Sequence, residues 1–260
     1  MTTTHENADF ITVFDCGLTT IDDGSAWFPW EGDRTLELST TAYLIGHGSD
    51  LLLWETGIDD DVAQDAEGRV VGPGVRTVLE TTLAEQFLSV GHRFEDVTAL
   101  GLSHGHVEHA GNVRHFPDAT WYVQATEHAV MFEPDAALLG FPPELVIPLR
   151  DNKTVLLDGD HDLFGDGSVV VLSTPGHTVG HQSLLVRLPG AGTVIIGGDI
   201  AHSWANLRHR RVPTISADAG AAARSMDRIA DLVDTENAQL WLGHDVGQSA
   251  TLRRAPQQIR

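Results

Sequence analysis

Residues 103–112 of the chain read SHGHVEHAGN, which places three histidines and a glutamate within six positions. The preceding run, residues 97–103, is mostly apolar and predicts a buried strand that ends at this cluster. Side chains alternate along an extended chain, so His104 and His106 should project the same way, with Glu108 and His109 on the turn that follows. Imidazoles and carboxylates are ligands for zinc, iron, cobalt or manganese. The stretch therefore predicts part of a metal site.

Three later stretches each end an apolar strand with a residue that can bind metal. LSTPGHTVGHQS offers His177, IIGGDIAH offers Asp199, and LWLGHD offers His244. If these strand ends share one rim of the fold, the combined side chains suffice for two metals, with Asp199 between them. The alternative for SHGHVEHAGN alone, a histidine-rich surface loop, does not account for the other three stretches.

The composition argues against several kinds of partner, although the charge could also serve solubility alone. The chain has 260 residues, and 37 acidic against 16 basic side chains give a formal net charge of −21. Such a surface repels nucleic-acid phosphates and anionic lipid. Cys16 is the only cysteine, so no disulfide can form within the chain. The opening MTTTHENADF lacks the regions of a secretion signal, and no apolar run approaches the roughly 20 residues of a membrane span. We therefore expect a soluble, cytoplasmic protein.

The organisation of the chain favours a single domain over residues 1–260, because no repeat, low-complexity tract or linker divides it. Strands and helices are predicted from apolar runs of period two and from helical spacing. They alternate in two similar halves, which favours the α/β class, as an αββα sandwich of two mixed sheets with helices outside. The predicted strands are 10–14, 40–46, 50–56, 97–103, 120–124, 153–157, 168–173, 182–188, 193–198 and 238–244, and the predicted helices are 74–91, 126–132 and 217–233.

Residues 133–152 carry four prolines and show no clear periodicity. A loop of this length in a compact domain is usually functional or disordered, and its apolar side chains argue against disorder. We interpret it as a flap over a pocket, with ordinary packing as the alternative.

With these motifs in this order, the sequence resembles the metallo-β-lactamase-fold hydrolases, and among them most of all the N-acyl-homoserine lactonases. The family pattern is H-x-H-x-D-H, a later histidine, a bridging aspartate and a last histidine. The resemblance implies the metallo-β-lactamase fold and two metal sites bridged by Asp199 and a hydroxide. The implied ligands are His104, His106 and His177 for the first metal and Glu108, His109 and His244 for the second.

Two acidic residues depart from that pattern. Glu108, and Glu55 in LLLWETG, each stand where the family has aspartate. One extra methylene adds about 1.5 Å of reach. Metal–oxygen bonds tolerate only a few tenths of an ångström. Glu108 therefore predicts a modified and weaker second site, with simple refitting of the chain as the alternative.

A third departure is His202, three residues after Asp199, where the lactonases often carry a tyrosine. Histidine can donate a hydrogen bond or a proton, so His202 and Asp199 are the candidate catalytic side chains, although His202 could equally be a bystander. His181 is expected to hydrogen-bond behind the metal ligands.

The resemblance implies a metal-dependent hydrolase that uses a metal-bound hydroxide on a lactone or related ester. Its cofactors would be two divalent ions, zinc first, with iron, manganese or cobalt as alternatives. Its partner would be a small-molecule substrate, and a homo- or hetero-oligomer stays open. Three other functions are retained: a hydrolase of activated aromatic ethers, like dinitroanisole demethylase; a non-catalytic subunit of a hetero-oligomer; and a mononuclear-iron, oxygen-using member such as a persulfide dioxygenase.

Overall fold

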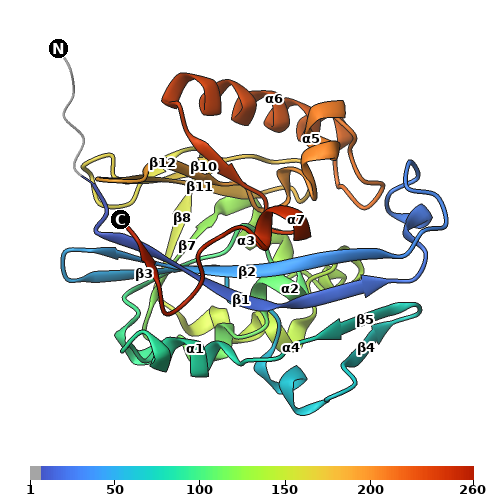
Figure 1. Ribbon diagram of the computed structural model, residues 1–260, viewed down its shortest axis with the longest axis horizontal. Coiled ribbons are helices and arrows are strands. Elements are labelled where there is room, and N and C mark those ends of the chain that lie inside the picture. Colours follow the sequence, from blue (N-terminus) through green and yellow to red (C-terminus); the bar gives the residue numbers. More distant parts are fainter. Residues whose placement is uncertain (1–6) are drawn as a thin grey trace.

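Two β-sheets pack face to face, and helices cover their outer faces, as the αββα prediction requires (Figure 1). The structure, a computed structural model, describes residues 7–260, so the first six residues of the opening stretch lie outside the described part. Among residues 7–260, no helix is both long and apolar enough to cross a membrane.

The larger sheet has the strand order β4-β5-β1-β2-β3-β6-β7-β8, with β14 paired to β1. Strands β3, β6, β7 and β8 are parallel neighbours, so their carboxyl ends lie at the same edge. Its strands are β1 (Phe10–Ile21), β2 (Leu36–His47), β3 (Asp50–Trp54), β4 (Arg69–Gly72), β5 (Val75–Val78), β6 (Ala99–Gly101), β7 (Thr120–Gln124), β8 (Thr154–Leu157) and β14 (Gln258–Ile259).

The smaller sheet has the order β13-β12-β11-β10-β9. Its strands are β9 (His161–Asp162), β10 (Val169–Ser173), β11 (Gln182–Leu188), β12 (Gly192–Ile196) and β13 (Gln239–Trp241). The helices are α1 (Leu83–Ser89), α2 (Val107–Ala110), α3 (Ala125–Met131), α4 (Pro143–Val146), α5 (Trp204–His209), α6 (Ala219–Glu236) and α7 (Val246–Ser249).

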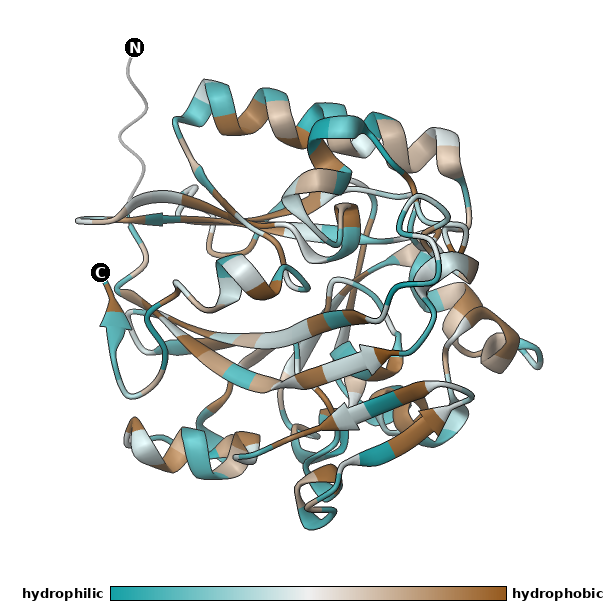
Figure 2. Cartoon of the chain, turned by 45° about the vertical axis from the view of Figure 1, so that its right-hand side comes forward, coloured by the Kyte–Doolittle hydropathy of each residue, from teal (hydrophilic) through white to brown (hydrophobic). Residues whose placement is uncertain are grey.

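The apolar core has one layer between the sheets and one on each outer face. Between the sheets, Tyr43 of β2 stacks on Trp241 of β13 with ring centroids 6.0 Å apart. Helix α6 packs Met226 and Ile229 on the smaller sheet, and both hydrophobic and hydrophilic residues are visible along it in Figure 2. Helix α1 packs Phe87 on the larger sheet, at the bottom of Figure 1. The two sheets thus form a rigid base for the loops at their rim.

The predicted helix 74–91 is wrong in its first half. Residues 75–78 form β5, which pairs with β1 and β4, and α1 begins only at Leu83. Two causes are visible. β-Branched Val75, Thr77 and Val78 favour a strand. Thr82 and Glu85 cap each other's backbone and so fix the first turn of α1.

Residues 133–152 are not one irregular loop. They fold as a 3-10 turn over 136–139, helix α4 and a second 3-10 turn over 147–151. Phe141, Val146 and Leu149 are buried and anchor the segment in the core, whereas Leu138 is 87% exposed. Periodicity was absent from the sequence because each helical piece is about one turn long.

The strand ends that carry the candidate metal ligands meet at one rim of the sandwich. The Gln182 amide donates to the Ser103 carbonyl at 2.9 Å, which joins the ends of the two sheets. The Ser39 amide donates to the His244 carbonyl at 3.3 Å and brings the last strand to the same place.

The Gly101→Ala variant should unfold more easily than the parent chain. Gly101 in β6 lies opposite Trp54 in β3, and an added Cβ would come within 2.5 Å of that buried indole. Overpacking of this kind costs about 1–3 kcal/mol. In the matched Gly72→Ala variant of edge strand β4, the nearest atoms would be 3.9 Å away. Its free energy of unfolding should change by less than about 0.5 kcal/mol. Urea unfolding measures both, and equal stability of the two variants would contradict this packing.

Candidate metal centre

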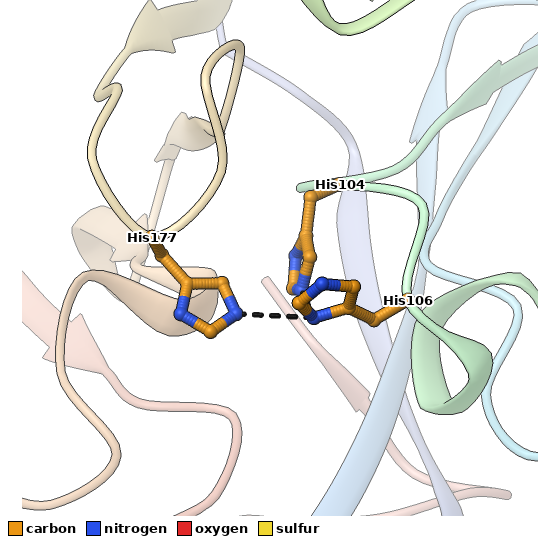
Figure 3. Close-up of side chains that lie close together, drawn as sticks. All are labelled: His104, His106 and His177. Carbon is orange, nitrogen blue, oxygen red and sulfur yellow. Dashed lines mark hydrogen bonds between the residues drawn. The ribbon is translucent and has the colours of Figure 1, made fainter. Parts of the chain in front are cut away.

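Three histidines from two loops turn their rings toward one point (Figure 3). His104 and His106 follow β6, and His177 follows β10. His104 Nε2 lies 2.8 Å from His106 Nδ1, and His177 Nε2 lies 3.2 Å from the same atom. One ligand atom from each residue lies within 4.8 Å of the other two. The structure thus brings the three predicted first-site residues together.

Hydrogen bonds on the far side of these rings decide where their protons lie. His106 Nε2 is 3.1 Å from the Leu139 carbonyl, which can only accept, so the proton of a neutral ring is on Nε2 and the Nδ1 lone pair faces inward. His104 Nδ1 is 2.9 Å from Ser103 Oγ, which leaves Nε2 as the inward atom. Burial lowers the pKa of His104, His106 and His177, and neutral imidazole is the form that binds metal.

The predicted second-site residues, Glu108, His109, Asp199 and His244, form a second group beside the first. Asp199 Oδ1 is 3.4 Å from His109 Nε2 and 3.2 Å from His244 Nε2. His244 Nδ1 is 2.7 Å from the Ser39 carbonyl, so the Nε2 lone pair of a neutral ring points at the group. Glu108 Oε1 lies farther out, 4.0 Å from His244 Nε2, and its side chain is 27% exposed.

The buried polar atoms of this group test whether a metal would fit. His109 Nε2, His244 Nε2 and both Asp199 carboxylate oxygens are buried without a hydrogen-bond partner. Buried polar atoms without partners are costly and therefore rare. All four belong to the same group, and a cation in their midst would satisfy them together. The donor set of imidazoles and carboxylates therefore fits divalent metals.

Asp199 joins the two groups. Its Oδ1 faces the second group, and its Oδ2 is 3.4 Å from His177 Nε2 of the first. Its backbone amide donates to His181 Nε2 at 2.9 Å, and His181 Nδ1 is 2.9 Å from Thr174 Oγ1. His181 thus hydrogen-bonds behind the ligands, as the sequence predicts.

The charges of the second group are coupled. Burial opposes a charge on His109, but the carboxylates of Glu55 and Asp199 outweigh it and raise the pKa of His109 well above its usual value. Burial also opposes a charge on Asp199, but the histidines around it, His244 and His202 foremost, lower the pKa of its carboxyl well below the usual range. Asp199 is therefore the ionised centre of the group.

His202 lies at the edge of the centre and is buried. Its Nε2 is 3.2 Å from Asp199 Oδ2, and its ring contacts Phe28 edge-on at 5.0 Å between centroids. Its Nδ1 has no hydrogen-bond partner. The position places a donor beside the carboxylate that joins the two groups.

Two residues that sequence reasoning passed over fix the second group from behind. Asn112 is fully buried, and its side-chain amide donates to the carbonyls of Thr56 at 2.9 Å and Ile58 at 2.8 Å. Thr56 Oγ1 donates to the His109 carbonyl at 2.9 Å. Asn112 closes the quoted stretch SHGHVEHAGN, so a polar side chain directly after a ligand cluster was the available signal.

A groove beside the first group is largely apolar. Its volume is about 460 Å³, and His106, Glu108 and His177 contribute to its lining. Leu138 and Leu139 of the 133–152 segment line one part of it. The other apolar residues of the lining are Trp27, Val107, Val130, Phe141, Val179, Ile215 and Ala217.

The family model of the metallo-beta-lactamase superfamily matches residues 35–236. The chain belongs to the metallo-β-lactamase superfamily. Membership confirms the resemblance that the histidine motifs predicted, the αββα fold class and the assignment to metallo-hydrolase enzymes.

Two curated members of the superfamily are similar over most of their length. N-acyl homoserine lactonase AttM of Rhizobium radiobacter is 29% identical over 231 residues, which are 85% of this chain and 87% of that protein. N-acyl homoserine lactonase AiiA of Bacillus thuringiensis subsp. kurstaki is 27% identical over 232 residues, which are 87% of this chain and 89% of that protein.

Solved structures of the superfamily share the fold. An N-acyl homoserine lactone hydrolase with the product N-hexanoyl-L-homoserine bound at its catalytic metal center has a TM-score of 0.84 at 24% identity, covering 98% of this chain and 100% of that one. AidC, a dizinc quorum-quenching lactonase, has a TM-score of 0.71 at 16% identity, covering 96% of both chains.

The His104→Ala and His177→Ala variants should each lose most of the first-site metal and of the activity. Each removes one of the three nitrogens that the first group offers to a metal. Elemental analysis after gel filtration measures metal per chain. His209→Ala, on the exposed surface of α5, is the matched control and should keep the parent's metal content. Full metal content in both site variants would refute the assignment.

Proposed function

We propose that this protein is a metal-dependent hydrolase that opens lactones carrying an apolar acyl chain, the N-acyl homoserine lactones. His104, His106 and His177 would hold one divalent metal, and Glu108, His109 and His244 a second, with Asp199 shared. Zinc suits these donors first. The observation that carries the proposal is the pair of inward-facing ligand groups joined by Asp199 at the end of an apolar groove.

Metals bound in these groups would supply Lewis acidity and bring the pKa of a coordinated water to around neutrality. The chain's own residues prepare that chemistry. Carbonyls at Leu139 and Ser39 hold the tautomers of His106 and His244, so the ligand atoms need no rearrangement. Burial of the ligands also excludes bulk water, which strengthens electrostatic interactions with the substrate.

The groove supports an amphiphilic substrate. Leu138, Leu139 and Ile215 are 87%, 51% and 39% exposed, although apolar side chains of this size are usually buried. An acyl chain lying on them would remove this surface from water while the lactone reaches His106 and His177. Both curated relatives are named N-acyl homoserine lactonases, which supports the same substrate class. Residues 133–152 are predicted as a flap over a pocket. In this proposal they form the wall of the groove that binds the acyl chain.

Ring opening consumes one water. The water oxygen forms a bond to the acyl carbon, and the bond between that carbon and the ring oxygen breaks. One water proton must reach the ring oxygen, which leaves as an alkoxide. Asp199 lies between the two ligand groups, so one of its carboxylate oxygens is placed to accept that proton and pass it on. His202, 3.2 Å from Asp199, can donate a hydrogen bond to the lactone carbonyl or supply the proton instead.

The second metal should bind more weakly than the first, because Glu108 lies farther from its group than the other members and is partly exposed. A chelator should therefore release metal in two steps, the second site first. Glu108→Asp should change the number of metal ions bound per chain or the metal affinity of the second site, since the carboxylate of aspartate reaches about 1.5 Å less far. Glu133→Asp, on the exposed surface, is the control. A single tight step for both metals, unchanged in Glu108→Asp, would count against a weakened second site.

The His202→Ala variant tests both the bond that is cut and the role of this side chain. The metal-loaded parent should hydrolyse N-acyl homoserine lactones, followed as acid release, and should release little alcohol from a nitroaryl methyl ether. His202→Ala should lower lactone turnover by about 10² to 10³, the cost of one lost oxyanion donor, and leave metal content unchanged. A lactone builds charge on its carbonyl oxygen, whereas an aryl ether spreads charge into its ring.

His209→Ala serves as the matched control and should behave like the parent. Clear alcohol release from the ether without lactone turnover by the parent would overturn the substrate assignment. Unchanged lactone turnover in His202→Ala would make His202 a bystander.

A further inference from the structure

A buried carboxylate outside both ligand groups connects the loops that carry the first group. Glu127, on α3, is only 1% exposed. The Gly105 amide donates to its Oε1 at 3.3 Å, and the Gly180 amide donates to its Oε2 at 2.9 Å. Gly105 lies between His104 and His106, and Gly180 lies three residues after His177. One carboxylate thus holds the backbone of both loops.

Packing brings both loops against the same helix. A Cβ on Gly180 would lie 2.5 Å from the Glu127 amide nitrogen, so this position leaves no room for a side chain. Thr126 Oγ1 donates to the Val179 carbonyl at 3.4 Å, a second link between α3 and this loop. A Cβ on Gly105 would lie 2.7 Å from the Met131 side chain at the other end of α3. Helix α3 is therefore packed tightly against both loops.

Burial of the Glu127 carboxylate costs free energy that packing alone does not offset. A buried carboxylate is unfavourable unless its charge is well solvated by the protein. Among the described residues, the groups that favour its charge are hydrogen-bond donors rather than a basic side chain, and burial raises the pKa of Glu127 to about 7. The proposed hydrolysis gives Glu127 no contact with substrate. Its contacts are the two ligand loops.

We propose that Glu127 is a positioning residue, which holds the His104–His106 turn and the His177 loop at the separation that the first metal needs, as the two amide hydrogen bonds to one buried carboxylate indicate. The inference rests on the metal centre of the proposed function. It assigns Glu127 no part in proton transfer or in substrate binding.

The test measures metal affinity rather than turnover. Glu127→Gln keeps the shape, but its NH₂ group would face one of the two amides, so one hydrogen bond is lost. Competition with a chromophoric chelator should show first-site affinity reduced by about 10- to 100-fold, as for other residues that orient metal ligands. The metal affinity of the second site should stay unchanged, because the Gly105 and Gly180 amides lie in the turn and the loop that hold the candidate first-site ligands. Cobalt-substituted protein should show an altered visible spectrum. The matched Glu133→Gln variant, with an exposed carboxylate near the end of α3, should change none of these readouts.

The outcomes separate this inference from the metal centre itself. The step that His104→Ala removes defines the first site, and the step that His244→Ala removes defines the second. If neither histidine variant removes a step, the proposed metal centre is wrong. If both do and Glu127→Gln shifts neither affinity by more than about twofold, only the positioning role is overturned, since that role predicts about 10-fold or more.

A measurement on the intact parent chain covers the case in which Glu127→Gln does not fold. In metal-loaded protein, the amide hydrogens of Gly105 and Gly180 should both be protected from exchange with solvent, because both donate to one buried acceptor. Exchange of either amide at the rate of an exposed one would overturn the proposal.

Discussion

The structure depends on one constraint. The inward-facing lone pairs of imidazoles and the carboxylate of Asp199 face one another in a buried site that water scarcely reaches. His104, His106 and His177 present inward nitrogens at 2.8 and 3.2 Å, and neutral imidazoles can satisfy only part of this set by hydrogen bonding to one another. Asp199 adds two buried oxygens without partners. Such an assembly is unstable by itself and becomes favourable around a cation. The surrounding fold is arranged to keep it assembled.

The candidate ligands are held in place by hydrogen bonds to segments that lie far apart in the sequence. The Leu139 carbonyl accepts from His106, the Ser39 carbonyl accepts from His244, and the Thr56 hydroxyl donates to the His109 carbonyl. A backbone carbonyl cannot donate, so the first two contacts fix both the ring orientation and the tautomer of His106 and His244, and the third holds the backbone at His109. These contacts come from segments that lie far apart in the chain: Ser39 in β2, Thr56 after β3 and Leu139 in the 133–152 segment.

The sequence marked the candidate ligands more clearly than the residues that support them, for a physical reason. A metal site demands rare residue types at strand ends, so His104, His177, Asp199 and His244 stood out without structural knowledge. Asn112 and Glu127 act through hydrogen bonds to backbone groups far away in the sequence, and nothing in their local sequence marks which groups those are. The helix predicted over 74–91 failed in a related way. Val75 and Val78 fit a helical stripe, yet pairing with β1 decided their conformation, and that pairing is a long-range property.

Two of the three departures from the family pattern, Glu108 and His202, line hollows beside the centre, whereas the third, Glu55, is buried behind it, with Oε2 3.2 Å from His109 Nδ1. Glu108 lines the apolar groove, and His202 lines a neighbouring hollow together with Phe28 and His244. The candidate first-site histidines match the pattern. His106 and His104 are held by contacts to the Leu139 carbonyl and Ser103 Oγ, and the Gly105 amide between them donates to Glu127. Substitution is least disruptive where a side chain meets solvent or substrate, because a change there need not displace the buried backbone that sets the ligands. The extra methylene of Glu108 and the imidazole of His202 therefore change side chains that line hollows beside the centre, whereas Glu55 accepts from the Ser103 amide among the buried contacts.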